Sequence, residues 1–184
     1  MTNLIRCDTK FTIQHPGGKM VEIHELSEST QSYLEVILDL ETTQKVARAK
    51  DIADCLGVQR GSVTGALKSL EGQGLIHYQP YSFITLTDTG KKIAEEIAHR
   101  HAVLKDFLLN VLQIDETTAE KTACRMEHVI DRKTVERLVC FIEYINTCPR
   151  AGKEWLESFV NFCRSDNQDG QKCKHCIDEL KVMG

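Results

Sequence analysis

Residues 49–70 of the chain read AKDIADCLGVQRGSVTGALKSL, in which Gly57 separates two apolar stripes of helical spacing. The first stripe ends at Leu56, and the second consists of Val63, Leu67 and Leu70. Apolar residues three or four positions apart lie on one face of a helix, and glycine commonly follows the last residue of a helix. The stretch therefore predicts two short helices joined by a turn at Gly57.

The outward face of the second predicted helix carries short polar and basic side chains. Ser, Thr and Gln can reach base edges in the major groove of DNA, while Arg and Lys bind phosphates. The same composition is also typical of a helix face that meets only water. The residues that we expect to contact DNA are Arg48, Lys50, Gln59, Arg60, Ser62, Thr64 and Lys68.

The neighbouring segments complete the pattern of a winged helix-turn-helix. Residues 29–40 form a helical stripe that Ser29 or Thr30 could cap. Residues 75–78 and 83–86 read as two strands around a turn. Three helices and a hairpin also occur in modules that bind only protein, so the order of elements does not by itself establish DNA binding. The polar helix face makes DNA binding the favoured interpretation.

The composition describes a chain that can bury a core but has no overall attraction to DNA. Its 184 residues are 41% hydrophobic, with a net charge of −4 and a pI near 6.0. A DNA-binding surface must therefore be a local patch. Residues 45–68 hold five basic residues against two acidic ones. No apolar run approaches the roughly 20 residues that span a bilayer, and we see no signal peptide, so we expect a cytoplasmic protein that does not contact membranes.

The second half of the sequence predicts further helices. Residues 89–112 form a long apolar stripe that contains His101, and a capping-box pattern, Thr117 and Glu120, opens the next predicted helix. Residues 133–146 form another amphipathic helix. This half is too apolar for a lone small domain, which favours a homodimer.

We therefore expect a mainly α protein with a small β-wing. Its predicted segments are an N-terminal arm with a possible hairpin (1–26), a winged helix-turn-helix DNA-binding domain (27–90), an all-helical metal-binding and dimerisation domain (91–147), and a cysteine-containing C-terminal segment (148–184).

Cys124, Glu127 and His128 place a thiol, a carboxylate and an imidazole at helical positions i, i+3 and i+4. All three would project from one helix face, and this mixture of ligands suits ferrous iron, manganese or zinc. His101 is a candidate fourth ligand, and Glu35 could complete the site from the first helix. The alternative is structural: Cys124 would be a core residue, the other two side chains of the triplet would be exposed, and His101 would be a hydrogen-bonded core residue.

Over residues 27–147 the chain resembles the DtxR/MntR family of iron- and manganese-dependent transcriptional repressors. The motifs that carry the resemblance are Tyr33-Leu34-Glu35, Gly57-Val58, Ser62-Val63-Thr64, Leu86-Thr87-Asp88-Thr89-Gly90-Lys91, Arg100-His101 and Cys124-Arg125-Met126-Glu127-His128. The resemblance implies a winged helix-turn-helix fold, a metal-binding helical domain, and repression of metal-homeostasis genes.

The resemblance also implies a metal site made of His101, Cys124, Glu127 and His128, with Glu35 added. A cysteine at position 124 matches the iron-responsive branch, whereas a glutamate at position 35 matches the manganese-responsive one. The chain departs from the family at other positions. Ser32 occupies the position of a metal ligand on the first helix. In the family's second metal site, Lys105 replaces an acidic residue, and Glu120 occupies the position where the iron-responsive branch has a histidine. Gly61 and Gly65 differ from base-contacting positions of the iron branch.

The C-terminal cysteines lie outside the resemblance. Cys148, Cys163, Cys173 and Cys176 have a spacing that could bind tetrahedral zinc or an iron–sulfur cluster. Unrelated reduced thiols are the alternative, because a chain without an export signal belongs to a reducing compartment. Cys55 and Cys140 fall among apolar positions, and we expect both to pack inside helix cores.

These patterns favour a homodimeric repressor, not an enzyme, that binds palindromic double-stranded operator DNA when loaded with Fe(II) or Mn(II). A DNA-binding redox or iron–sulfur sensor that uses the C-terminal cysteines is the first alternative. A zinc hydrolase that uses the triplet of residues 124–128 is the second, although no glycine-rich pocket loop or further acid–base pair accompanies it.

Overall fold

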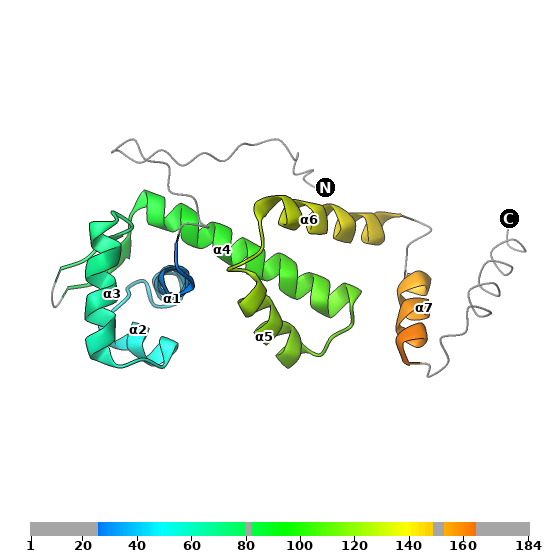
Figure 1. Ribbon diagram of the computed structural model, residues 1–184, viewed down its shortest axis with the longest axis horizontal. Coiled ribbons are helices and arrows are strands. Elements are labelled where there is room, and N and C mark those ends of the chain that lie inside the picture. Colours follow the sequence, from blue (N-terminus) through cyan, green and yellow to red (C-terminus); the bar gives the residue numbers. More distant parts are fainter. Residues whose placement is uncertain (1–25, 80–81, 149–152, 165–184) are drawn as a thin grey trace, which may run out of the picture.

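The computed structural model of the protein describes residues 26–79, 82–148 and 153–164. The described part consists of helices and one two-stranded sheet, which confirms the mainly α prediction (Figure 1). The predicted N-terminal arm lies outside these residues except for Leu26, and Cys173 and Cys176 also lie outside them. Within these ranges, every helix is too short or too polar to cross a bilayer.

Helix α1, Glu28–Gln44, starts one residue before the predicted stripe. Its N-cap is Ser27, whose hydroxyl accepts a hydrogen bond from the backbone N–H of Thr30 at 3.2 Å. The prediction that Ser29 or Thr30 caps the helix is therefore wrong. A serine oxygen that accepts from the third residue of the helix satisfies one of the free N–H groups at this end.

The helix-turn-helix prediction is confirmed. Helix α2 spans Ala49–Leu56 and helix α3 spans Arg60–Gly72. Gly57 ends α2 with a φ of +65°, a left-handed conformation that favours glycine. The three predicted core residues of α3, Val63, Leu67 and Leu70, are all buried.

The wing is shorter than predicted. Strand β1, Ile76–His77, pairs antiparallel with strand β2, Thr85–Leu86. A single bridge from Ala47 to Ile84 ties the wing to the chain before α2. Glu41 of α1 also accepts a hydrogen bond from the backbone N–H of Leu86 at 2.9 Å.

Helix α4, Asp88–Asp106, continues into a π-helical turn η2, Phe107–Val111, so the predicted long helix is present but changes its hydrogen bonding in the last turn. Its first turn contains Gly90, where an added Cβ would collide with the backbone carbonyl of Leu75. The first half of α4 packs in the core made by α1–α3 and the wing. The second half packs in a separate core with α5 and α6.

Helix α5 spans Glu116–Met126 and is capped by Asp115, which accepts a hydrogen bond from the backbone N–H of Thr118 at 3.0 Å. The capping box predicted at Thr117 is therefore wrong, because the helix begins before that residue. Helix α6 spans Arg132–Thr147. Helix α7, Lys153–Arg164, follows beyond α6 (Figure 1).

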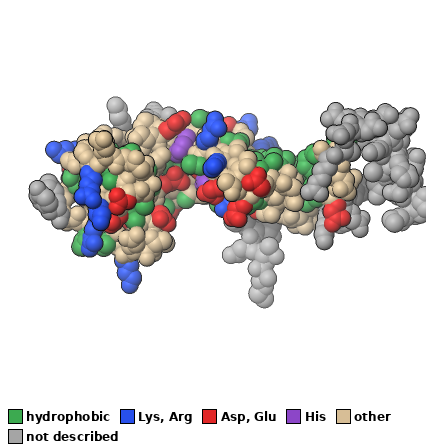
Figure 2. All heavy atoms as spheres, turned by 90° about the horizontal axis from the view of Figure 1, so that it is seen from below, with side chains coloured by type: hydrophobic (Ala, Val, Ile, Leu, Met, Phe, Trp, Pro, Cys, Tyr) green, Lys and Arg blue, Asp and Glu red, His purple; other side chains and the backbone are tan. Residues whose placement is uncertain are grey.

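The two cysteines that were predicted to lie in helix cores, Cys55 and Cys140, are not buried. Cys55 on α2 and Cys140 on α6 are both exposed, so the prediction that they pack inside helix cores is wrong. Each lies on the polar side of an amphipathic helix, next to the apolar stripe instead of within it. Figure 2 shows basic side chains gathered at the end of the molecule that α2 and α3 form.

Candidate metal centre

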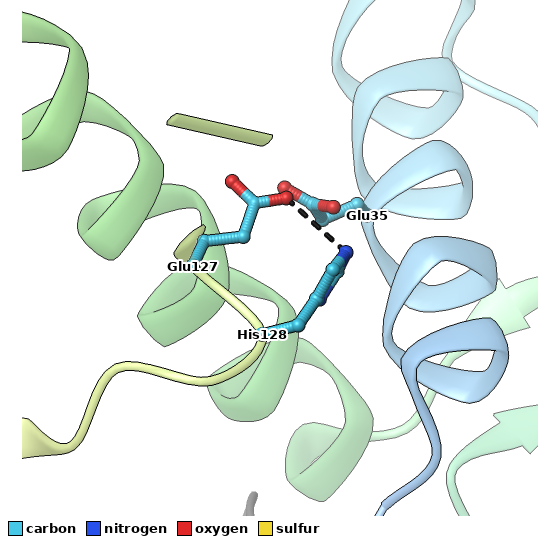
Figure 3. Close-up of side chains that lie close together, drawn as sticks. All are labelled: Glu35, Glu127 and His128. Atoms are coloured by element: carbon cyan, nitrogen blue, oxygen red, sulfur yellow. Dashed lines mark ion pairs between the residues drawn. The ribbon is translucent and has the colours of Figure 1, made fainter. Parts of the chain in front are cut away.

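Three side chains with metal-binding atoms converge between the two halves of the molecule. Glu35 extends from α1, and Glu127 and His128 extend from the end of α5 (Figure 3). One ligand atom from each lies within 4.8 Å of the others. The structure thus brings together residues from the winged module and from the helical half.

A tight turn after α5 aims two of these side chains. The helix ends at Met126, whose carbonyl accepts hydrogen bonds from the backbone N–H groups of Val129 and Ile130 at 3.1 and 3.0 Å. Arg100, only 3% exposed, donates to the carbonyl of Ile130 at 3.1 Å and ties this turn to α4. Glu127 is the C-cap of α5, and its backbone N–H still donates to the carbonyl of Ala123 at 3.0 Å, so the predicted helix face reaches Glu127 while His128 lies in the turn that follows.

Glu127 has an unsatisfied buried oxygen. The residue is 1% exposed, and its Oε2 lies 2.6 Å from Nδ1 of His101. Among the described residues, Oε1 has no hydrogen-bond partner, and it lies 3.5 Å from Nε2 of His128. A buried carboxylate oxygen without a partner is costly, and a cation bound by Glu127, Glu35 and His128 would remove that cost. The donor set therefore fits a metal ion.

The charges of the site point the same way. Burial, followed by the nearby charge of Glu127, raises the pKa of Glu35 from 4.5 to about 7. Burial also raises the pKa of Glu127 to about 7. Burial lowers the pKa of His128, which favours the neutral imidazole that binds metals. The two carboxyl groups therefore hold protons more strongly than ordinary glutamates do, and a cation can replace those protons.

His101 lies beside the three converging ligands and bridges them to a second group of charges. Its Nδ1 contacts Glu127, and its Nε2 lies 3.2 Å from Glu120. The ammonium of Lys105 lies 2.8 Å from the other oxygen of Glu120 and 3.7 Å from Glu116. Lys105 therefore supplies a positive charge where the resemblance implied an acidic metal ligand.

Cys124 is not one of the three converging residues, but its thiol is hydrogen-bonded to Glu127. The residue is exposed on α5, and partial burial of the thiol together with the charges of Glu127 and Glu35 raises its pKa. Like the two glutamates, the thiol must lose its proton to bind a metal ion. Ser32 is engaged elsewhere, because its hydroxyl donates to the carbonyl of Glu28 at 3.0 Å. Of the five predicted ligands, three converge, and His101 and Cys124 each contact Glu127.

Sequence reasoning missed a buried amide in contact with the site. Gln31 on α1 is 1% exposed, and its Oε1 lies 3.1 Å from Nδ1 of His128. Its Nε2 donates to the carbonyl of Leu26 at 3.0 Å. The available signal was its position, three residues before Leu34, which puts a polar side chain on the apolar stripe of the first helix.

The seven predicted DNA contacts are all exposed, around α3 and the start of α2. They lie at the end of the molecule where Figure 2 shows the basic side chains. The guanidinium of Arg48 lies over the ring of Phe83 on the wing, 5.3 Å from the ring centroid. This cation–π contact holds Arg48 between the wing and α2. The role of the seven residues in DNA binding stays a prediction.

The C-terminal cysteine site also stays a prediction. Cys148, half-buried, packs near the end of α6 against a small apolar cluster, and Cys163 is exposed on α7. The other two cysteines of the predicted site lie outside the described residues.

Comparison with protein families gives two adjoining matches. Residues 25–84 match the family described as iron dependent repressor, N-terminal DNA binding domain. Residues 87–156 match the family described as iron dependent repressor, metal binding and dimerisation domain. The two matches meet near the start of α4.

Comparison with known proteins gives relatives over most of their length. The chain is 34% identical over 119 residues to an uncharacterized HTH-type transcriptional regulator of Methanocaldococcus jannaschii. This match covers 64% of this chain and 95% of the relative. It is 33% identical over 131 residues to the transcriptional regulator MntR of Salmonella typhimurium. This match covers 71% of this chain and 83% of that protein.

Solved structures show the same arrangement of elements. The structure of the manganese regulator SloR matches with a TM-score of 0.56 and 27% identity. A manganese-dependent transcriptional repressor in complex with manganese matches with a TM-score of 0.55 and 27% identity. These matches cover 65% and 62% of this chain, and the chain spans 56% and 53% of the length of those structures.

Proposed function

Because the chain belongs to the iron-dependent repressor family, we propose that it is a repressor that binds operator DNA only when a divalent metal ion occupies the site of Glu35, Glu127 and His128. The observation that carries this proposal is the origin of the ligands. Glu35 lies on α1 of the winged module, whereas the other two follow α5 of the helical half.

The ligands connect the two parts of the molecule that a repressor must orient. When bound, a divalent cation supplies the positive charge that lets the two carboxylates approach one another without protons. Glu35 is then held against the turn after α5, so the orientation of α1 and of the winged module is fixed relative to the helical half. DNA binding and metal binding that favour the same orientation must strengthen each other equally.

A homodimer would present two α3 helices to successive major grooves of a palindrome about one helical turn apart. The helical half offers a surface for such pairing. Large apolar side chains remain exposed there, namely Val129, Phe141, Tyr144, Trp155 and Phe162. Exposed apolar groups of this kind commonly mark sites of association.

The converging ligands support Mn(II) as the physiological metal, ahead of Fe(II). Two carboxylates and an imidazole suit manganese, whereas a thiolate ligand would favour softer metals. Glu35, the residue that matches the manganese-responsive branch, is in the site. Cys124, which matches the iron-responsive branch, is hydrogen-bonded to Glu127 but is not one of the three converging residues. The similarity to proteins named as manganese regulators agrees with this choice.

A DNA-binding assay tests the proposal. Duplexes are first selected from a random-sequence pool with protein and Mn(II), and binding is then measured with no metal, with Mn(II), and with Fe(II) under anaerobic conditions. Metal is expected to strengthen binding at least tenfold, and both Glu127→Ala and His128→Ala should abolish this response. Glu95→Ala, at an exposed position on α4, is the matched control. Equal binding with and without metal, or an unchanged response in both site variants, would reject the proposal.

A further inference from the structure

Gln31 is a buried polar side chain in an otherwise apolar part of α1. It is 1% exposed and lies between two groups, the backbone carbonyl of Leu26 and the ring of His128. Buried side-chain amides in proteins are usually hydrogen-bonded. Here one of the two partners belongs to the candidate metal centre.

The carbonyl of Leu26 determines which way the amide of Gln31 points. A carbonyl oxygen can only accept a hydrogen bond, so the group 3.0 Å from it must be the NH₂ group, Nε2. The amide oxygen Oε1 therefore faces His128, 3.1 Å from Nδ1. The backbone immediately before the N-cap of α1 thus fixes the orientation of a side chain one turn further along the helix.

The orientation of the amide in turn determines the tautomer of the histidine. Oε1 can only accept, so Nδ1 of His128 must carry the proton of the neutral ring. The other ring nitrogen, Nε2, then has a free lone pair. Nε2 is also the atom that lies 3.5 Å from Oε1 of Glu127, the buried oxygen that has no hydrogen-bond partner among the described residues.

We propose that Gln31 is a positioning residue that holds His128 in the Nδ1–H tautomer with Nε2 aimed at Glu35 and Glu127, so that the metal site is formed before the ion arrives. This proposal rests on the proposed function in one respect, namely that His128 is a metal ligand. Groups that hydrogen-bond the second nitrogen of a ligating histidine fix its orientation, and their removal commonly costs 10- to 100-fold in metal affinity.

Two substitutions separate positioning from simple stability. Gln31→Met keeps the length of the side chain but removes the hydrogen bonds to Leu26 and His128, and we expect Mn(II) affinity to fall about 10- to 100-fold. Gln31→Glu keeps an acceptor for Nδ1–H but loses the donor to Leu26, so the folded state should be less stable while Mn(II) affinity stays within about threefold of the wild type. If Gln31 only stabilised the fold, Mn(II) affinity would fall with stability in both variants.

The control is Thr42→Val on the same helix. It removes a side-chain hydrogen bond to the carbonyl of Leu38, at 2.8 Å and away from the site, and should leave Mn(II) affinity unchanged. Affinity is measured on the full chain by titration with Mn(II) alone, with the free ion followed by electron paramagnetic resonance. Thermal unfolding of each metal-free variant measures stability.

Nitrogen-15 NMR of the metal-free protein reads the tautomer directly, and the spectrum of His128→Gln assigns the signal. The wild type should show the Nδ1–H form of His128, and Gln31→Met should shift the ring toward the Nε2–H form. An Nε2–H ring in the wild type, or equal Mn(II) affinity in the wild type and Gln31→Met, would overturn the inference. A wild type that shows the expected tautomer but binds no Mn(II) would instead reject the proposed function.

Discussion

His101 on α4 and Glu127 after α5 are joined by a contact of 2.6 Å between Nδ1 and Oε2. The same imidazole reaches Glu120 with its other nitrogen, at 3.2 Å. The ring therefore sits between two carboxylates, one buried in the candidate site and one at the surface of α5. Because His101 holds Glu127 by one oxygen, it leaves the other oxygen for a cation.

This contact predicts that His101 matters more for Mn(II) binding than Cys124, although the sequence suggested both as metal ligands. His101→Ala removes the partner of Glu127 and should weaken Mn(II) binding about tenfold or more. Cys124→Ser keeps a hydrogen-bonding group beside Glu127 and changes none of the three converging ligands, so it should weaken Mn(II) binding less than about threefold. Calorimetric titration of both variants measures the difference. The opposite order would mean that the thiol is the ligand and would favour iron.

Mn(II) binding should depend on pH in the neutral range. The pKa values of Glu35 and Glu127 are both raised to about 7, and both groups must lose their protons to bind a cation. Affinity should therefore rise as the pH increases through 7 and level off above about 8. Calorimetry in buffers of different ionisation enthalpy counts the protons released. No proton release near pH 6.5 would contradict this prediction.

The stability of the metal-free protein should change with pH in the opposite direction. In the unfolded chain the carboxyl groups lose their protons near the ordinary value of 4.5, whereas in the folded protein they keep them to about 7. Between these values the folded state binds more protons, so its free energy of unfolding decreases as the pH rises. Glu35→Gln should flatten this dependence, which chemical denaturation at several pH values measures. A dependence as steep as that of the wild type would contradict the assignment.

Lys105 should limit the protein to one metal ion per chain. Its ammonium already neutralises the carboxylates of Glu120 and Glu116 next to His101. Lys105→Glu would replace that charge with a third carboxylate, and we expect the stoichiometry of Mn(II) to rise from one to two per chain. Lys92→Glu, at an exposed position of the same helix, is the control and should remain at one. Two ions bound by the wild type would show that the ammonium is displaced.

Gly90 should tolerate no side chain. A Cβ at this position would collide with the backbone carbonyl of Leu75, which cannot move without disturbing the wing. Gly90→Ala should therefore lower the free energy of unfolding by about 3 kcal/mol or more, at the upper end of the usual cost of overpacking. Gly72→Ala, where nothing lies within 4 Å of the added atom, should be neutral or stabilising. Denaturant unfolding of the two variants measures both effects.

The winged module could be predicted because each of its signals is local. Gly57 ends a helix for a conformational reason, and the spacing of Val63, Leu67 and Leu70 sets the buried face of α3 without help from the rest of the chain. The helix ends were harder to place. Asp115 and Thr117 both resemble caps, and only the backbone geometry decides between them.

The candidate site could be predicted only in part, because it is assembled from segments far apart in the sequence. Glu127 and His128 were found from their spacing, although the helix reaches only to its C-cap Glu127 and His128 lies in the turn beyond it. Cys124 has the same spacing, but its distance from Glu35 on α1, which spacing along one helix does not give, decides whether it belongs to the converging group. Gln31 could not be assigned a role, since its contact with His128 exists only when α1 packs against the turn after α5.

Helix α4 packs in both cores, with Ile93 and Ile97 in one and Val103 and Leu104 in the other. Within the described residues, the two halves are therefore connected by a helix and not by a loop that could act as a hinge. A change in the angle of the DNA-reading end must arise from bending of α4 or from shear, the sliding of α1 along α4, in which packed helices shift only slightly. Repression in this protein would then depend on small displacements of α3, because a palindrome with fixed half-site spacing tolerates little change in the position of that helix. It would not require a large rotation of one domain.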